Sequence, residues 1–180
     1  MLQITIPKTE FFNESTQEFF YIKEQTLCLE HSLVSVAKWE SKWKKAFLGN
    51  DPKTMDELVD YIRCMTITQN VDPICYLGLT KENLEFVKNY IDDSMTATTF
   101  RKNQNQRKHH EIVTAEIIYY WMIELGIPFE CQKWHLNRLM TLIRVCNIKN
   151  TPPEKMSRGD IYRQNAALNA ARRKAHGTRG

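Results

Sequence analysis

A cysteine and a histidine four residues apart form the first pair in this sequence that could carry a specific chemistry. Cys131 and His135 lie in the stretch ECQKWHLNRLMTLIRVCN, at the spacing that places two side chains on one face of a helix. There they could hold a zinc ion, with His109 or His110 as a third ligand. The sequence contains no CxxC pair and no HExxH motif, however. We therefore expect no metal, with Cys131 packed in the interior and His135 hydrogen-bonded at the start of a helix.

No other set of residues predicts catalysis. P-loop, GxSxG and dinucleotide-binding glycine patterns are absent, and the six glycines leave few positions for a phosphate-binding loop. Asp56 and Asp60 could form a pair of carboxylates, as could Asp92 and Asp93. Each of them lies on a polar face or near the end of a predicted helix, where acidic side chains are ordinarily solvated. We expect a protein that is not an enzyme and that has neither a cofactor nor a small-molecule substrate.

The same stretch could instead be part of a helix-turn-helix that reads DNA. A recognition helix needs an exposed row of arginine, lysine, asparagine or glutamine side chains to reach base edges. After Pro128 such residues are interleaved with a continuous Leu-Met-Leu-Ile stripe, which is typical of a protein core. DNA binding through this stretch is therefore not favoured.

The elements that must position these residues begin with two predicted strands. Apolar and polar side chains alternate in LQITI and again from Phe19 to Leu29, with the polar loop FNESTQE between them. From Ser32, a plausible N-cap, the pattern changes to helical spacing and continues to a break at GNDP. The apolar face of this helix is formed by Val36, Trp39, Trp43 and Phe47.

Further helices follow at regular intervals. Thr54 is placed to cap the helix MDELVDYIRCM, and Thr80 is placed to cap KENLEFVKNYI, with an irregular connection between them. The polar run at 101–110 is expected to be a loop or arm. Two strongly apolar helices, over 112–125 and 136–146, are separated by a Gly-Ile-Pro joint. So short a joint predicts an αα hairpin or a steep crossing.

The resulting fold class is α+β and mostly helical. We expect a small N-terminal β-hairpin or sheet followed by about five helices, including the C-terminal αα hairpin and a basic helical tail. Residues 1–150 would form a single globular α+β domain, and residues 151–180 a partly helical arm. Five cysteines in a chain of this size do not predict disulfides.

The charge of +4 belongs mainly to the arm. Residues 151–180 carry seven basic and two acidic side chains, so the first 150 residues carry one more acidic than basic side chain. The sequence has no run of the ~20 apolar residues that a membrane span requires, and no signal-peptide pattern at its start. We expect a soluble protein with no membrane partner.

Candidate partner-binding residues lie in three places. Trp39 and Trp43 could present a stacking or docking surface, although packing in the core is the favoured interpretation. Aromatic residues of the first apolar helix could supply surplus apolar surface, namely Tyr119, Tyr120 and Trp121. The arm could be a solvated extension, a nonspecific phosphate binder, or a segment that folds on a partner. The last is favoured because apolar side chains are spaced among Arg158, Arg163, Arg172, Arg173 and Lys174.

Four segments resemble a known family. LEHSLVSVAKWESKWKKAFL, YIRCMT, TAEIIYYWMIELGIPFECQKWHLNRLMTLIRVCN and QNAALNAARRKAHGTRG are similar to tail assembly chaperones of long-tailed, siphovirus-type bacteriophages. The resemblance covers nearly the whole chain. It implies a non-enzymatic viral protein in the host cytoplasm that coats the tape measure protein, delivers tail tube subunits and associates with itself. The alternatives are a virion protein of the head-tail connector or tail terminator, and a nucleic-acid-binding protein that acts through its basic tail.

Overall fold

The structure, a computed structural model, describes residues 1–13, 17–100, 112–151 and 157–177. The loop expected at 101–110 lies outside these residues. The chain divides into two compact units, Met1–Asn147 and Ile148–Gly180, so the boundary expected after residue 150 falls three residues earlier. The architecture is α+β and mostly helical, as the sequence predicts, with six α-helices and two short 3-10 helices in the described part.

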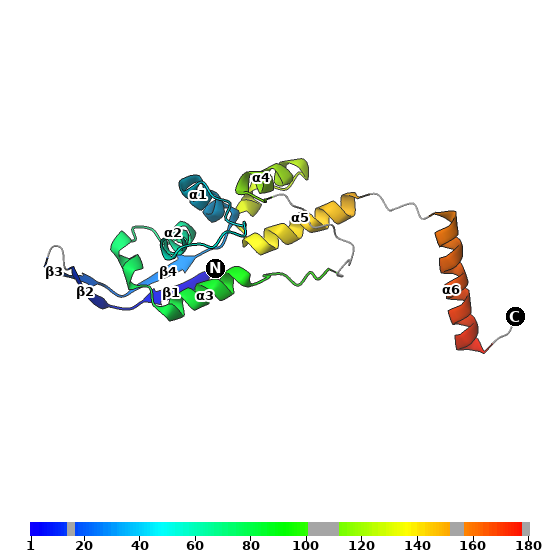
Figure 1. The fold of residues 1–180 in the computed structure, drawn as a ribbon, viewed down its shortest axis with the longest axis horizontal. Helices are drawn as coiled ribbons and strands as arrows, with labels where there is room; N and C mark the ends of the chain where they lie inside the picture. Colours follow the sequence, from blue (N-terminus) through cyan, green and yellow to red (C-terminus); the bar gives the residue numbers. More distant parts are fainter. Residues whose placement is uncertain (14–16, 101–111, 152–156, 178–180) are drawn as a thin grey trace. The chain divides into compact units, whose positions relative to one another are not determined.

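The N-terminal strands form one interrupted β-hairpin. β1 (Leu2–Ile6) pairs antiparallel with β4 (Gln25–Leu29), and β2 (Thr9–Asn13) pairs antiparallel with β3 (Glu18–Ile22) (Figure 1). We expected two strands, so the single strand over Phe19–Leu29 and the placement of Phe12 in a loop are both wrong. Pro7 has no amide hydrogen to donate to the ladder and lies where β1 gives way to β2.

Helix α1 (Leu33–Trp43) begins at the predicted cap and ends earlier than predicted. The Ser32 side chain accepts a hydrogen bond from the Ser35 amide at 3.3 Å, and Ser35 Oγ accepts one from the Ser32 amide at 2.9 Å. Lys44 then adopts a left-handed conformation with φ of 55°, which ends the helix. Phe47, predicted to extend the helical face, lies in the following loop and is buried there.

Helices α2 (Met55–Met65) and α3 (Lys81–Asp92) match their predicted bounds and caps closely. Thr54 and Thr80 each accept a hydrogen bond from the amide three residues ahead, which satisfies one of the unpaired amides at a helix start. Between them lies the 3-10 helix η1 (Pro73–Gly78), within the predicted irregular connection. A Cβ at Gly78 would come within 2.8 Å of Ile6 Cγ2 and 3.3 Å of Ile22 Cδ1, so only glycine fits against the strands there.

The first apolar helix is shorter than predicted, the second extends beyond its predicted end at residue 146, and the joint between them is longer than Gly-Ile-Pro. α4 (Ala115–Glu124) starts after the exposed Ile112, and α5 spans Leu136–Asn150. The chain turns at Gly126, whose φ of 63° favours glycine, and then forms the 3-10 helix η2 (Phe129–Lys133). Trp121 of α4 and Met140 of α5 line one pocket, so the two helices are neighbours.

The core of the first unit lies between the β1–β4 pair and the surrounding helices. Large, fully buried apolar side chains come from β1, β4, α1, α2, α4 and α5, namely Ile6, Leu27, Leu29, Leu33, Trp39, Tyr61, Met65, Ile118, Met122, Leu136 and Leu139. The five cysteines are separate thiols.

The second unit contains helix α6 (Arg158–His176), within the arm that was predicted to be partly helical. All its described side chains are exposed. No helix among the described residues is both long enough and apolar enough to cross a membrane.

Candidate partner-binding surfaces

Cys131 and His135 do not share a helical face. Cys131 is a buried residue of η2, whereas His135 lies between η2 and α5, so the premise of helical spacing was wrong. His135 Nε2 lies 2.9 Å from the Tyr90 carbonyl oxygen, and its Nδ1 accepts a hydrogen bond from the Asn137 amide at 3.3 Å. Nδ1 therefore serves the start of α5, whereas Nε2 connects His135 to α3. Within the described residues, no three His, Cys, Asp or Glu side chains gather around a common point.

His135 contacts a second buried histidine at the centre of the unit. The His31 and His135 rings lie 5.0 Å apart between centroids, and His31 Nδ1 lies 2.5 Å from the Tyr61 hydroxyl oxygen. Burial, with a smaller contribution from His135, lowers the pKa of His31 to about 3. Burial also raises the pKa of Tyr61, so the tyrosine stays protonated. Its hydroxyl group forms a hydrogen bond with the neutral imidazole of His31. This pair therefore organises the core as a polar contact without charge.

Glu40 joins two distant segments of the same core. One carboxylate oxygen accepts a hydrogen bond from the Phe47 amide at 2.7 Å, and the other accepts one from the Ala115 amide at 2.8 Å. A buried carboxylate that is hydrogen-bonded at both oxygens has a structural role here, because it fixes the loop after α1 to the start of α4.

Trp39 and Trp43 occupy different environments. Trp39 is 1% exposed, and its Nε1 donates to the Glu57 carbonyl oxygen at 2.8 Å, so its indole is closed to any partner. Trp43 is half-buried and donates through Nε1 to Asp60 Oδ2 at 2.9 Å. Trp43 lines a surface pocket.

The three aromatic residues of α4 point in different directions. Tyr119 is half-buried and its hydroxyl donates to Gln132 Oε1 at 2.9 Å. Tyr120 is 59% exposed, whereas Trp121 is half-buried against α5. They do not form a common surface, and Tyr120 is the one of the three that a partner reaches freely.

The predicted basic residues of the arm lie along α6. Arg158 and Arg163 are in its first two turns, and Arg172, Arg173 and Lys174 are in its last turns, all with exposed side chains. Cations near a helix C-terminus are favoured by the helix dipole, so this distribution also stabilises α6.

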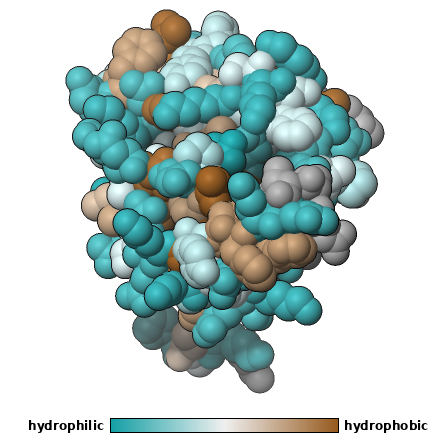
Figure 2. All heavy atoms as spheres, turned by 90° about the vertical axis from the view of Figure 1, so that its left-hand side faces the viewer, coloured by the Kyte–Doolittle hydropathy of each residue, from teal (hydrophilic) through white to brown (hydrophobic). Residues whose placement is uncertain are grey.

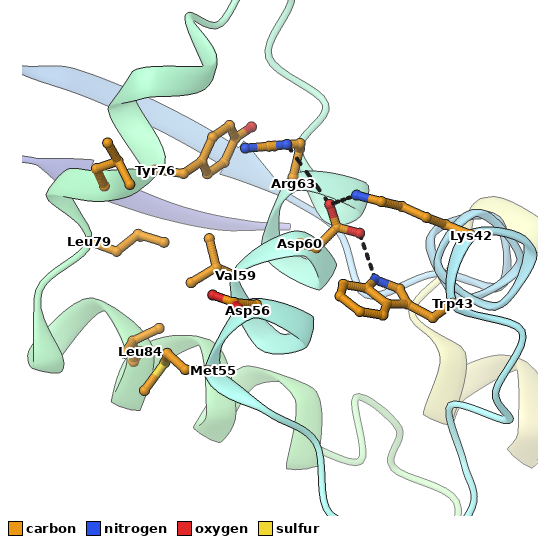
Figure 3. A pocket seen from close by; sticks show the side chains of 11 residues that line it. Lys42, Trp43, Met55, Asp56, Val59, Asp60, Arg63, Tyr76, Leu79 and Leu84 are labelled. Atoms are coloured by element: carbon orange, nitrogen blue, oxygen red, sulfur yellow. Dashed lines mark hydrogen bonds and ion pairs between the residues drawn. The ribbon is translucent and has the colours of Figure 1, made fainter. Parts of the chain in front are cut away.

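An apolar groove that the sequence did not predict runs between α2 and α3. Two adjoining pockets, of about 600 and 480 Å³, share Met55 and Leu84 in their walls. Figure 3 shows the first pocket, where Met55 of α2 and Leu84 of α3 lie near each other. This pocket also includes Leu77 of η1, and the second pocket includes Leu58 and Ile62. Met55 and Leu77 are each 59% exposed, so the groove presents apolar surface without a partner in the described chain.

The charged groups at one end of this groove compensate one another. Asp60 accepts hydrogen bonds from Lys42 Nζ at 2.5 Å and from Trp43, and Arg63 lies 3.9 Å from the same carboxylate (Figure 3). Burial opposes ionisation of Asp60, but the bonds from Lys42 and Trp43 outweigh it and lower the pKa of the carboxyl group. Arg63 also stacks over the Tyr76 ring at 5.1 Å. The groove therefore has an apolar floor, and at the end next to α1 its rim carries the paired charges of Lys42, Asp60 and Arg63.

One signal in the sequence could have revealed the groove. α2 carries Met55, Leu58, Val59, Ile62 and Met65, which is more apolar residues than one buried face of three turns requires. The core takes Ile62 and Met65, while Met55 and Leu58 remain exposed. An apolar surplus on both sides of a helix therefore indicated a second contact surface.

The far half of the hairpin forms a second exposed apolar surface. Phe12 of β2 and Phe19 of β3 are opposite each other, with ring centroids 4.8 Å apart, and both are at least half exposed. Tyr21, on the same face, is 63% exposed. Figure 2 looks onto the end of the molecule where this hairpin lies and shows apolar surface among hydrophilic residues. Aromatic cross-strand pairs stabilise a hairpin, but their exposure also offers a contact surface.

Known proteins give no further indication of function. Comparisons of the chain with protein families, curated sequences and solved structures find no match.

Proposed function

We propose that this chain is a tail assembly chaperone of a long-tailed bacteriophage. It holds an amphipathic helical segment of the tape measure protein in the groove between α2 and α3 until tail tube subunits enclose that segment. The resemblance in sequence supports the class of protein. The observation that carries the site is the open apolar groove, with Met55 and Leu58 exposed on one wall and Leu84 on the other.

The groove has the chemistry that a helical client needs. Amphipathic helices bind in such grooves through apolar side chains at positions i, i+3, i+4 and i+7. A methionine at the mouth adapts to different side chains because its thioether chain is flexible and polarizable. Paired charges at the rim, such as Asp60 with Lys42, contribute hydrogen bonds and orientation without leaving an unpaired charge in the complex.

A chaperone of this kind must also release its client. A client contact confined to one groove is small compared with interfaces of permanent complexes, so it favours moderate affinity and rapid exchange. Tube subunits that bind the same client surface more extensively would then displace the chaperone. No covalent bond is made or broken in this cycle, which agrees with the structural roles of the buried His31 and His135.

The proposal is tested by co-expressing this chain with the tape measure protein of the same virus. Leu58→Asp places a charge on the groove wall and is expected to reduce co-purification at least about tenfold, because the charge must be desolvated in the complex. Ile67→Asp is the matched control, since Ile67 is exposed to a similar degree, at 51% against 39%, and lines neither pocket. Circular dichroism checks that both variants are folded. Equal capture of the two variants would reject the groove as the client site.

The exposed aromatics of the hairpin favour a second candidate function. Phe12, Phe19 and Tyr21 suit a permanent contact, as in a connector or terminator ring of the virion. Mass spectrometry of purified particles separates the two candidates. A ring component is present in a fixed copy number, whereas an assembly factor is absent or present in trace amounts.

A further inference from the structure

We infer that two copies of this chain exchange their C-terminal helices, with α6 of each copy packed on the exposed face of α4 in the other. This goes beyond the proposed function, because it concerns a different surface and a partner that is the chain itself. Such an exchange gives the C-terminal arm a role in self-association that does not involve the client groove.

The exposed face of α4 is apolar in the middle and acidic at both ends. Glu116, Tyr120, Ile123 and Glu124 lie at i, i+4, i+7 and i+8, which places them on one side of the helix. Tyr120 and Ile123 are 59% and 64% exposed. The segment 112–132 contains three glutamates and no lysine, arginine or histidine. Among the ion pairs of the described residues, none involves these glutamates.

One face of α6 likewise has charged residues on either side of an apolar pair, with the opposite charge and a longer spacing. Arg158, Ile161, Leu168 and Arg172 lie at i, i+3, i+10 and i+14, within about 80° around the helix axis at 100° per residue. Ile161 and Leu168 are 44% and 49% exposed. The two arginines lie about 21 Å apart along the axis and enclose the apolar pair. α6 as a whole carries five basic residues and one acidic residue.

The exposed face of α4 and this face of α6 are complementary, because both have apolar centres and their charges are opposite. Packing Ile161 and Leu168 on Tyr120 and Ile123 removes apolar surface from water, while the arginines at the ends of α6 meet the glutamates around α4. An arginine can in addition stack on the ring of Tyr120. A helix whose described side chains are all exposed gains most of its stability from such a contact, because intrinsic propensity alone leaves it marginal.

The second copy is a better occupant than an unrelated basic or acidic protein for two reasons. Both complementary faces belong to the same chain, so every copy carries one of each. A reciprocal exchange also forms two helix contacts per dimer, and one such contact alone is small for a stable interface. The inferred assembly is therefore a dimer with twofold symmetry.

The test uses full-length chains with reversed charges at exposed positions. The first variant carries Glu116→Arg and Glu124→Arg, and the second carries Arg158→Glu and Arg172→Glu. In either variant alone, like charges meet at both contacts, and we expect self-association to weaken at least about tenfold. In an equimolar mixture, opposite charges meet again at both contacts of a heterodimer, and association is restored.

Sedimentation velocity gives the readout, since the monomer mass is 21.3 kDa and the dimer mass is twice that value. The inference is supported if the wild type is dimeric, each variant alone is monomeric, and the equimolar mixture is dimeric. A dimeric mixture also shows that both variants are folded. Three outcomes would overturn the inferred exchange. The wild-type chain could be monomeric, or the mixture could remain monomeric because each α6 docks within its own chain. The third outcome is that α6 binds DNA and no dimer forms. Client capture is measured separately with Leu58→Asp, so failure of the groove and failure of the exchange are distinguishable.

Discussion

The two compact units of this chain differ in what stabilises them. In Met1–Asn147, a dense core surrounds the polar groups, and no buried side-chain nitrogen or oxygen among the described residues lacks a hydrogen-bond partner. In Ile148–Gly180, helix α6 exposes all its described side chains, including Tyr162 at 80%. The first unit thus takes its stability from internal contacts, whereas α6 depends on helix propensity, capping charge and whatever it binds.

The largest expected difference between the units comes from removing one aromatic side chain from each. Trp39→Ala deletes a buried indole that also donates to the Glu57 carbonyl oxygen. We expect it to lower the free energy of unfolding by about 3–5 kcal/mol. Tyr162→Ala, in α6, is expected to change it by less than about 0.5 kcal/mol. Urea denaturation followed by tryptophan fluorescence measures both, and similar effects at the two positions would remove the distinction between the units.

Acid should destabilise the first unit through His31. The folded pKa of His31 is about 3, well below the ordinary value near 6.5, so the unfolded state binds a proton in this interval that the folded state does not. The free energy of unfolding therefore falls as the pH decreases from about 6.5 towards 4.5, by up to about 1.4 kcal/mol per pH unit. Glu57 and Asp60 have lowered pKa values, so their contributions are lost only at still lower pH.

The variant His31→Gln isolates this effect. Glutamine retains an acceptor for the Tyr61 hydroxyl but does not titrate, so the slope of stability against pH above about 4.5 is expected to flatten. His176→Gln, on exposed α6, is the matched control and should preserve the wild-type slope. Denaturation curves at several pH values provide the measurement. A slope that survives in His31→Gln would assign the acid sensitivity to another group.

The smallest expected effect on the first unit comes from breaking α6. Ala166→Pro interrupts α6 near its middle, at a local cost of about 3 kcal/mol, and should reduce the helical signal in circular dichroism. At protein concentrations low enough to keep the chain monomeric, the melting temperature of Met1–Asn147 is expected to change by less than about 1 °C, because α6 belongs to the other unit. A larger shift would show that the first unit relies on α6 for its stability.

Much of the fold follows from local patterns in the sequence. The caps Ser32, Thr54 and Thr80 locate three helix starts, because an N-cap side chain acts on amides only two or three residues away. The errors arise where tertiary contacts override periodicity. Phe47 continues the spacing of α1 but is buried from a loop, since Lys44 ends the helix and Glu40 binds the Phe47 amide. The break in the hairpin depends on both strands, so one strand's alternation could not reveal it.

The candidate sites were harder to predict than the fold. The basic residues of α6 and Tyr120 were predicted as partner-binding residues from their types and are exposed, whereas the α2–α3 groove was not predicted. A groove arises where two helices separated in sequence leave apolar side chains uncovered. The sequence around Met55 or Leu84 alone does not indicate that these side chains line a groove. The Cys131–His135 pair shows the converse error, because a spacing of four residues acquires chemical meaning only if the backbone is helical throughout.

Gly78 has a consequence for how the hairpin could evolve. Ile6 and Ile22, the two side chains closest to it, belong to different halves of the hairpin, the β1–β4 pair and the β2–β3 pair. A single added methyl group would therefore press on both halves at once, and the rigid β-branched isoleucines could not rotate away. Relatives with an aromatic hairpin of different reach or tilt should consequently have altered residue 78 together with its two isoleucine neighbours, as a linked set of substitutions.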